Sequence, residues 1–507
     1  MANLFRILVA IWCLPFLDLS SANAENDRNF FRDLNSAIDD ILDRENCDQP
    51  FLDLQTMITT ETFEQRIDAA DQAYIYRVLL SCVDVQRDRP ALTRFHRAWR
   101  GLQLDGEVEW SYRWQLHSLA QWGAYEAAID LVEDWIERGD FWRQTFDYRS
   151  VRNVVRAIEE HAPDHRQPAI KNEFFNLMWE NDYRGETELS DLSFYIYDHI
   201  SVLVELGDLE AAKKIGQRLS NPQVQIRLHL LHKFESVRDD LGLGIDWDIT
   251  AAYEAHLAKL NSQRLAYPHL IEAHNDYLLL LKALGRDQET ITVAERVLAQ
   301  HDSDPEQFTD RDQQLNWLLN SKAYAHANLG QLDAAIAAFE RAIDSGEDGH
   351  TNVSQVINLA ITLQNAGQHD RAITTLERMG DPSAFGKMFE HRLRACAQHA
   401  RGQIDLARQT LVLLENNFSD NLSAIQDVYA CLGLEEKGAE LMIERLSDPN
   451  LQDDAFMSML VPKARPDKIG AGNATSITLR YVLARDDVQS AAAKVGRLVE
   501  LPIYQEF

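Results

Sequence analysis

The feature that most constrains the fold is a repeated pattern of small and apolar residues in the second half of the chain. Four stretches of this kind are centred on Gly285, Gly330, Gly367 and Gly402. Glycine readily adopts the positive backbone angle that ends a helix, and small residues on either side let two antiparallel helices approach closely. A near-constant period of this length is typical of a solenoid, in which each repeat contacts only its neighbours. The pattern therefore predicts a stack of helical hairpins.

The clearest copy, WLLNSKAYAHANLGQLDAAIAAFERAI, spans residues 317–343. In it, Ala323 lies seven residues before Gly330 and Ala335 lies five residues after it. The next two copies keep the same three positions, as Ala360, Gly367 and Ala372 and as Ala395, Gly402 and Ala407. From Gly330 onwards the turn glycines follow at 37, 35 and 31 residues, at Gly367, Gly402 and Gly433. Three tandem copies indicate a true repeat.

Residues 316–411 resemble the tetratricopeptide repeat (TPR), a family that places small residues at these positions of each helical hairpin. Two departures are visible, since His326 and Leu363 stand where the family commonly has an aromatic residue. No proline closes the repeat that ends near Glu347. The resemblance implies an all-α, right-handed superhelical solenoid of antiparallel helix hairpins. It also implies that the first helices line a concave groove that binds a protein or peptide.

Weaker copies of the pattern surround Gly123 and Gly207, so the hairpins are expected to continue into the first half, about ten to twelve in all. Proline-containing polar runs fall between the expected helices, and apolar residues almost never alternate with period two, so no sheet is expected. The predicted ranges are a signal peptide at 1–24, degenerate helical repeats at 25–270, TPR-like repeats at 271–447, and a linker with C-terminal capping helices at 448–507.

Residues 1–24 have the features of a secretory signal peptide. Arg6 precedes an apolar run, and the segment ends in the small-x-small sequence Ala-Asn-Ala at Ala24. The apolar run is shorter than the ~20 residues that a membrane-spanning helix needs. Export to the bacterial periplasm is therefore predicted, without an integral membrane span, and an uncleaved anchor is the alternative.

Four cysteines follow this segment, and the two candidate pairs, Cys47 with Cys82 and Cys396 with Cys431, are each separated by 35 residues. This separation is close to one repeat period, so each pair can lie on neighbouring hairpins and form a disulfide in an oxidising compartment. Helix backbones held ~10 Å apart would be too distant for a bridge, and buried free thiols are the alternative. The absence of a short Cys-x-x-Cys or Cys/His motif argues against a metal site.

The charge balance bears on the class of partner. With 80 acidic and 50 basic residues, the net charge is −30. Such a surface repels nucleic acid and favours a basic or neutral protein partner, although a simply solvated acidic exterior would have the same composition. The sequence contains no zinc-protease, serine-hydrolase or P-loop motif, so no enzymatic activity and no cofactor are expected. The oligomeric state stays open.

If the first helices line a groove, as the resemblance implies, ligand-facing positions lie 13, 10, 6 and 2 residues before each turn glycine. Amide side chains at these positions can pair with a peptide backbone while aromatic rings cover its side chains. The candidate partner-binding residues, named here the groove residues, are Trp317, Asn320, Tyr324, Asn328, Asn365, Phe389 and Arg392. Packing of Trp317 and Tyr324 against a neighbouring hairpin is the alternative.

Tryptophan is concentrated in the first half, where seven of the ten residues of this type lie between Trp99 and Trp179. Trp110 and Trp114 are four residues apart and share a helix face with His117. Exposed aromatic faces can stack on sugar rings, so binding of a glycan or the cell wall is the alternative function. The structural alternative is that these rings fill gaps between irregular hairpins.

Overall fold

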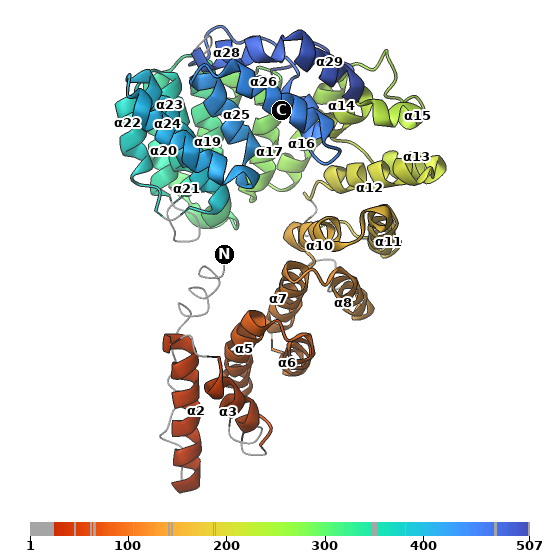
Figure 1. Ribbon diagram of the computed structural model, residues 1–507, viewed down its shortest axis with the longest axis vertical. Coiled ribbons are helices and arrows are strands. Elements are labelled where there is room, and N and C mark those ends of the chain that lie inside the picture. Colours follow the sequence, from red (N-terminus) through yellow and green to blue (C-terminus); the bar gives the residue numbers. More distant parts are fainter. Residues whose placement is uncertain are drawn as a thin grey trace. The chain divides into compact units, whose positions relative to one another are not determined.

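The computed structural model divides the chain into two compact units, residues 1–192 and 193–507, which are described separately below. Within the described residues each unit is built mainly from α-helices, so the predicted all-α helical solenoid is confirmed (Figure 1). The signal peptide predicted at 1–24 lies outside the described residues. The structure describes residues 25–44, 47–60, 63, 67–104, 106–139, 142, 145–185, 187, 189–345, 352–380, 382–470 and 474–504.

The first unit contains a series of helices that pack onto their neighbours in chain order. Aspartate side chains cap three of them, because Asp68, Asp88 and Asp147 each accept a hydrogen bond from the backbone N–H three residues later. The helices are α2 (Glu25–Arg44), α3 (Gln49–Met57), α5 (Ala69–Gln86), α6 (Arg89–Gly101), α7 (Glu107–Gln121), α8 (Tyr125–Glu137), α10 (Tyr148–His161) and α11 (Gln167–Glu180).

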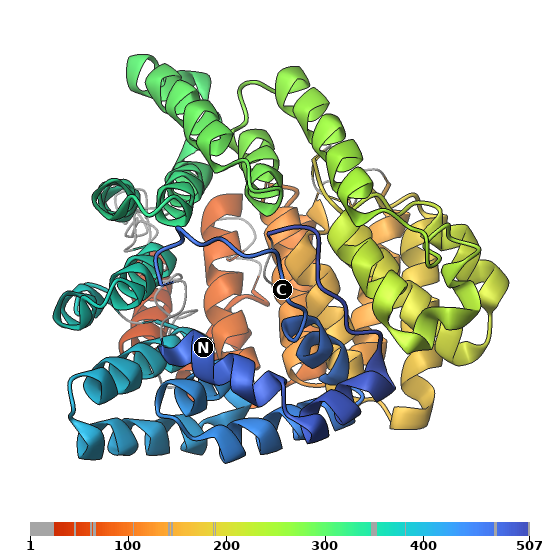
Figure 2. The same ribbon diagram turned by 90° about the horizontal axis from the view of Figure 1, so that it is seen from above.

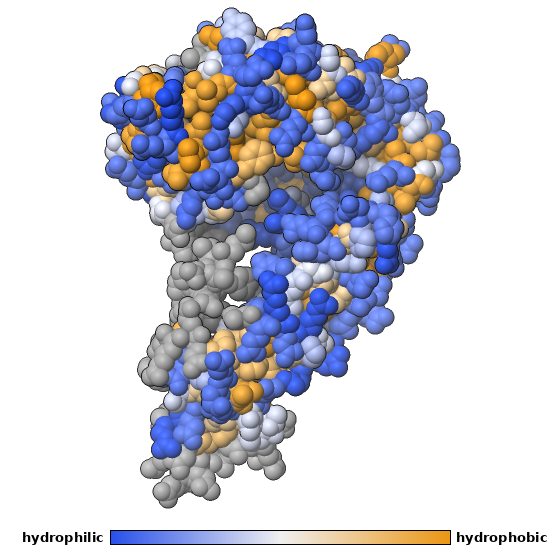
Figure 3. Space-filling view, in the orientation of Figure 1, coloured by the Kyte–Doolittle hydropathy of each residue, from blue (hydrophilic) through white to orange (hydrophobic). Residues whose placement is uncertain are grey.

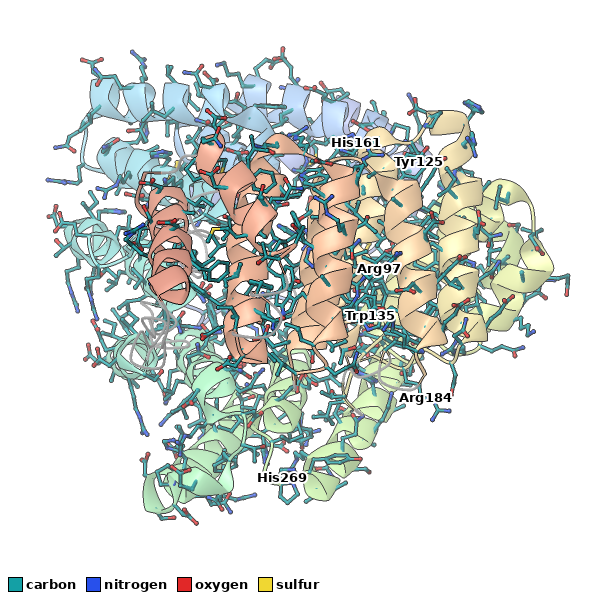
Figure 4. All side chains as sticks on the ribbon, turned by 90° about the horizontal axis from the view of Figure 1, so that it is seen from below. Arg97, Tyr125, Trp135, His161, Arg184 and His269 are labelled. Carbon is teal, nitrogen blue, oxygen red and sulfur yellow. A yellow bond between two sulfur atoms is a disulfide. The ribbon has the colours of Figure 1, made fainter. Side chains whose placement is uncertain are left out.

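Aromatic side chains form much of the core of this unit. Trp135, labelled in Figure 4, is fully buried and stacks on Tyr112 with ring centroids 4.8 Å apart. Trp99 is also buried and meets Trp114 edge to face at 6.0 Å. The structural interpretation of the tryptophan-rich region therefore holds for these side chains. Trp110 differs from them, because 59% of its surface is exposed.

The second unit begins with the helices that carry the weaker repeat at Gly207 and continues through the TPR-like repeats. It contains α12 (Ser193–Leu206), α13 (Leu209–Gly216), α14 (Pro222–Leu230), α15 (Glu235–Arg238), α16 (Ile249–Ala266), α17 (Ile271–Ala283), α18 (Asp287–Ser303), α19 (Arg311–Asn328), α20 (Leu332–Asp344), α21 (Val353–Asn365), α22 (His369–Leu376), α23 (Ala384–Ala400), α24 (Ile404–Asn416), α25 (Leu422–Cys431), α26 (Glu435–Ser447), α27 (Gln452–Ser458), α28 (Ala474–Leu483) and α29 (Asp486–Val495).

The last helices of the second unit contact its first helices. Asp453 of α27 accepts a hydrogen bond of 2.6 Å from the Tyr197 hydroxyl of α12, and Asp454 pairs with Arg227 of α14 at 2.8 Å. Further on, the backbone N–H of Arg497 donates to the carbonyl of Leu230 at 3.0 Å. The helices of this unit therefore close into a ring, and the C-terminal segment crosses its middle (Figure 2). Helices α28 and α29 pack on α25 and α26.

Both candidate cysteine pairs are disulfides in the structure. Cys47 bonds to Cys82 with Cα atoms 5.3 Å apart, and Cys396 of α23 bonds to Cys431 of α25 with Cα atoms 5.6 Å apart. For the second pair, side chains that face each other between the packed helices α23 and α25 come closer than the helix axes, which is why the bridge forms. The second disulfide ties two successive first helices of the repeat region together.

The division into compact units at residue 192 falls inside the range 25–270 that was assigned to degenerate repeats. The four ranges proposed from the sequence stay a prediction. Of the helices that the structure describes, none combines the length and the apolar character that crossing a bilayer requires.

Candidate functional site

The turns of the TPR-like hairpins have the backbone conformation expected from the sequence. Gly285, Gly330, Gly367 and Gly402 have φ angles of +75°, +72°, +74° and +74°. This left-handed conformation is open to glycine at little cost and ends the first helix of each hairpin. N–H groups of the turn donate to some carbonyls in the last turn of that helix, as Gly285 does to Lys282 and Gly330 does to Ala327, and each such carbonyl oxygen can accept a second hydrogen bond.

Trp317 and Asn320 lie on α19. Trp317 is half-buried, and Asn320 is buried with its side-chain oxygen accepting a hydrogen bond of 2.9 Å from the Asn358 amide of α21. The amide oxygen of Asn320 is thus engaged between two successive first helices. A similar contact joins the next pair, because the Gln364 amide donates to the backbone carbonyl of Leu393 at 3.1 Å.

Tyr324 and Asn328 lie further along α19 and share one cluster of side chains with α17 and α18. The Tyr324 ring meets Phe339 edge to face at 5.3 Å, and the ammonium group of Lys282 lies 5.3 Å from its centroid. The Asn328 amide donates to Asp287 at 2.8 Å. The Tyr324 ring therefore packs against Phe339 of its own hairpin and the apolar cluster that contains it, and it also contacts the Lys282 ammonium group of the preceding hairpin.

The remaining groove residues lie on the two following first helices. Asn365 is half-buried at the end of α21. The ring centroids of Phe389, on α23, and Phe385 are 5.2 Å apart, and the Arg392 guanidinium carbon lies 5.3 Å from the Phe389 centroid. Arg392 also forms an ion pair with Asp427 of α25. The structure therefore brings Tyr324 and Asn328 together around Asp287, and places Phe389 and Arg392 in a second group further along the repeats.

A buried carboxylate anchors the first group. Asp287, in the first turn of α18, is only 4% exposed and forms an ion pair with Arg465. The Arg465 guanidinium also donates to the backbone carbonyl of Lys282, near the end of α17. A carboxylate and the carbonyls at a helix C-terminus both attract a cation, so these groups form a binding site for the guanidinium.

Arg465 belongs to a non-helical C-terminal segment, named here the docked tail and defined as residues 461–469 and 500–504. A turn follows Arg465 and is closed by the Lys468 N–H, which donates to the Arg465 carbonyl at 3.2 Å. The two parts pair with each other through backbone hydrogen bonds from Lys463 to Ile503 at 2.7 Å and from Leu501 to Val461 at 2.8 Å. Their side chains also meet, because Arg465 lies 4.7 Å from the ring centroid of Tyr504. The two parts of the docked tail therefore pack together as one unit.

The docked tail binds the turn ends of α17 and α19 through its backbone. The N–H of Tyr504 donates to the carbonyl of Ala283 at 2.8 Å, and the N–H of Ile469 donates to the carbonyl of Ala327 at 2.9 Å. The fit is close, because a Cβ atom added to Gly285 would lie 2.5 Å from the Tyr504 ring and one added to Gly330 would lie 2.9 Å from the carbonyl oxygen of Asp467. The turn glycines therefore serve the tail contact as well as the turn.

Lys282 is the titratable group most affected by this arrangement. Burial lowers the pKa of Lys282 from 10.5 to about 8, with Asp287 opposing the shift and the positive charge of Arg465 adding to it. The pKa of Lys282 should therefore change when the charge of Arg465 in the docked tail is changed. Within the described residues, no group of three or more His, Cys, Asp or Glu side chains is arranged to hold a metal ion.

Sequence reasoning missed Asp287, Arg465 and Tyr504. One local signal was present, because Asp287 stands two residues after its turn glycine, where the following repeats have Leu332, His369 and Ile404. The second signal was the segment VPKARPDKIG, residues 461–470, which carries three basic residues and one acidic residue in an acidic chain. Neither signal indicates that the two regions meet.

The surface of the protein offers other features. The face drawn in Figure 3 is largely hydrophilic with apolar patches. Among the exposed apolar side chains of the second unit are Leu406, Val412 and Leu413 of α24. In the first unit, α6 carries a shallow cavity of about 630 Å³ whose lining includes Arg89, Arg94 and Arg97, the last labelled in Figure 4. The contacts of the docked tail set the Asp287 site apart, because there the structure holds a non-helical segment in place.

The ring of hairpins and its turn ends define the class, which is a helical-repeat protein. More particularly, residues 318–387 match the family model described as tetratrico peptide repeat, so this part of the chain consists of TPR-like repeats. No curated protein matches the chain. Among solved structures, a "circular tandem repeat protein with novel repeat topology and enhanced subunit contact surfaces" aligns over 97% of each chain at 14% identity, with a TM-score of 0.12. Repeats of the TPR type indicate a protein-interaction scaffold.

Proposed function

We propose that the protein is a non-enzymatic scaffold of the bacterial cell envelope that binds a protein or peptide segment through its TPR-like repeats. One observation carries this proposal. The turn ends of α17 and α19 hold a non-helical segment by two backbone hydrogen bonds and a buried ion pair, and peptide ligands are bound by contacts of the same kinds.

The chemistry of the repeats favours a partner with basic side chains. Carbonyls at helix C-termini and the carboxylate of Asp287 attract cations, and the net charge of −30 raises the rate at which a basic partner encounters the surface. The groove residues are the positions at which such a partner is expected to bind, in particular the half-buried ring of Trp317 and the exposed neighbourhood of Phe389 and Phe385.

Export to the periplasm is part of this proposal. The two disulfides support it, because disulfides persist in oxidising compartments and are rare in the bacterial cytosol. The signal sequence at residues 1–24 supplies the route.

Affinity capture from envelope extract tests the scaffold function. Purified residues 25–507 are compared with the double variant Trp317→Ala/Tyr324→Ala, and with Tyr481→Ala as a matched control, because Tyr481 is exposed and lies on α28. We expect a discrete protein to be retained by the wild type and the control and to be lost by the double variant, with unchanged far-UV circular dichroism. Equal retention by all three would exclude the groove residues, and no retained protein would count against the scaffold.

A second candidate function is binding of glycan or cell wall by the tryptophan-rich half. The exposed ring of Trp110 is the observation in its favour, whereas Trp114 is buried and donates its indole N–H to Asp84 at 2.7 Å. This function predicts that the protein sediments with purified peptidoglycan and that Trp110→Ala abolishes sedimentation. Sedimentation that survives this change would remove Trp110 as the binding residue.

A further inference from the structure

The docked tail occupies the same cluster that contains two of the groove residues. Asp287 accepts from Asn328 and pairs with Arg465, and Lys282 contacts Tyr324 through its ammonium group while its carbonyl accepts from Arg465. Arg465 of the docked tail and the groove residues Tyr324 and Asn328 are therefore linked through Asp287 and Lys282.

We infer that the turn ends of α17 and α19 form a site for an arginine-containing peptide, and that residues 461–469 fill this site in cis and compete with the partner. This inference rests on the proposed function, since it names the chemistry and the regulation of the same repeats. The partner is then a basic segment that resembles the tail.

The selectivity for arginine follows from the shape and charge of the site. Asp287 is buried, so the carboxylate is stable only when a cation and hydrogen-bond donors neutralise it. A planar guanidinium serves both acceptors at once, donating to Asp287 and to the carbonyl of Lys282. An ammonium group is compact and more strongly hydrated, so lysine at the same position would satisfy the two acceptors less well.

The tail has the properties of a peptide ligand. Arg465 lies 178 residues from Asp287 in sequence, and the segment around it docks without adding a helix to the stack. Pro462 and Pro466 flank the arginine and restrict the residues before them to extended conformations, which lowers the entropy lost on binding. Lys463, Arg465 and Lys468 against Asp467 give the segment a charge of +2 in a chain of −30.

The docked tail does not contact the turn glycines of the next two hairpins, Gly367 and Gly402. A Cβ atom added at Gly367 or Gly402 would meet nothing within 4 Å, whereas at Gly285 and Gly330 it would meet the tail. The hairpins have the same turn geometry, so docking is specific to the turn that carries Asp287 and to the next one. Because the tail is part of the same chain, its effective concentration is of the order of millimolar, and a partner peptide binds weakly until the tail is displaced.

Binding of a synthetic peptide tests the inference on the full mature chain. The probe is a fluorescent peptide of residues 459–470, MLVPKARPDKIG, and a matched probe carries glutamine in place of the arginine. The released variant is Arg465→Gln/Tyr504→Ala, and the blocked variant adds Asp287→Asn to it. We expect the released variant to bind the arginine peptide at least tenfold more tightly than the wild type. The glutamine peptide and the blocked variant should each lose that gain.

Equal affinity of the wild type and the released variant would overturn competition by the tail. Binding that survives in the blocked variant would overturn Asp287 as the recognition residue. If the released variant does not fold, hydrogen exchange decides instead. The Ile469 amide should be protected in the wild type and lose protection in Tyr504→Ala, and unchanged protection overturns the inference. Partner capture tests the scaffold separately, because a protein that is retained by the wild type and lost in Trp317→Ala/Tyr324→Ala supports the scaffold whether or not the released variant binds the peptide more tightly.

Discussion

Replacing Gly285 by alanine separates the contribution of the docked tail from that of the turn. Gly285 and Gly402 have nearly equal φ angles of +75° and +74°, so alanine in this left-handed conformation costs about 1–2 kcal/mol at either position. At Gly402 the added Cβ meets nothing within 4 Å. At Gly285 it would lie 2.5 and 2.6 Å from two carbon atoms of the Tyr504 ring, which must therefore move away.

The extra cost at Gly285 follows from the contacts that Tyr504 makes. Its backbone N–H donates to the carbonyl of Ala283, a bond worth about 1 kcal/mol. The side chains of Lys463 and Arg465 lie 5.2 and 4.7 Å from its ring centroid, and each such contact contributes about 0.5–1 kcal/mol at an exposed site. Displacing the ring should therefore lower the free energy that holds residues 500–504 against α17 and residues 461–469 by about 2–3 kcal/mol.

Native-state hydrogen exchange measures this difference directly. The amides of Ile469 and Tyr504 should exchange about 30- to 150-fold faster in Gly285→Ala than in the wild type, if they exchange by local opening of the tail. In Gly402→Ala the same amides should keep their protection, although thermal stability falls. Equal protection in both variants would refute the reasoning that Tyr504 is held against Gly285.

Three further predictions concern other parts of the structure. Cys396→Ser/Cys431→Ser should cost about 3–4 kcal/mol of stability, because the disulfide closes a loop of 35 residues, and added reductant should lower the thermal midpoint of this variant less than that of the wild type, since only Cys47–Cys82 is left to reduce. The pKa of Lys282, observed through its Cε resonance, should lie near 8 and rise in Arg465→Gln, because a neighbouring positive charge is removed. Since this pKa is below the 10.5 of the unfolded chain, folding releases a proton between these values, and the contribution of Lys282 to stability should increase as pH rises from about 8 towards 10.5. Mass spectrometry of the secreted protein should find Glu25 at the amino terminus, and retention of residues 1–24 would favour the uncleaved anchor.

Much of the repeat architecture could be predicted from the sequence because it depends on local patterns. The positive φ at Gly330 and the small side chains of Ala323 and Ala335, both fully buried, act within one hairpin, and the same spacing recurs in the next two. The cysteine spacing of one repeat period indicated possible pairs. Only the packed helices brought the Cα atoms of Cys396 and Cys431 to 5.6 Å.

The candidate site could be predicted in part. Tyr324 and Asn328 were chosen from their distance to a turn glycine, and the structure places both in the cluster around Asp287. The group that completes this cluster, Arg465, could not be found in this way. No pattern of fixed period relates a position in the first turn of α18 to one that follows α27.

The sequence by itself therefore determined the helical hairpins, their turns and the class of protein, because contacts between neighbours in a solenoid follow from residues a few positions apart. Only the tertiary structure decided that the second unit closes into a ring and that its C-terminal segment lies across the turn ends of α17 and α19. Closure is the sum of small rotations between successive hairpins, and no single repeat encodes it. Asp287 and Arg465 form their ion pair because the summed rotations bring the C-terminal segment back to the helices near the middle of the chain.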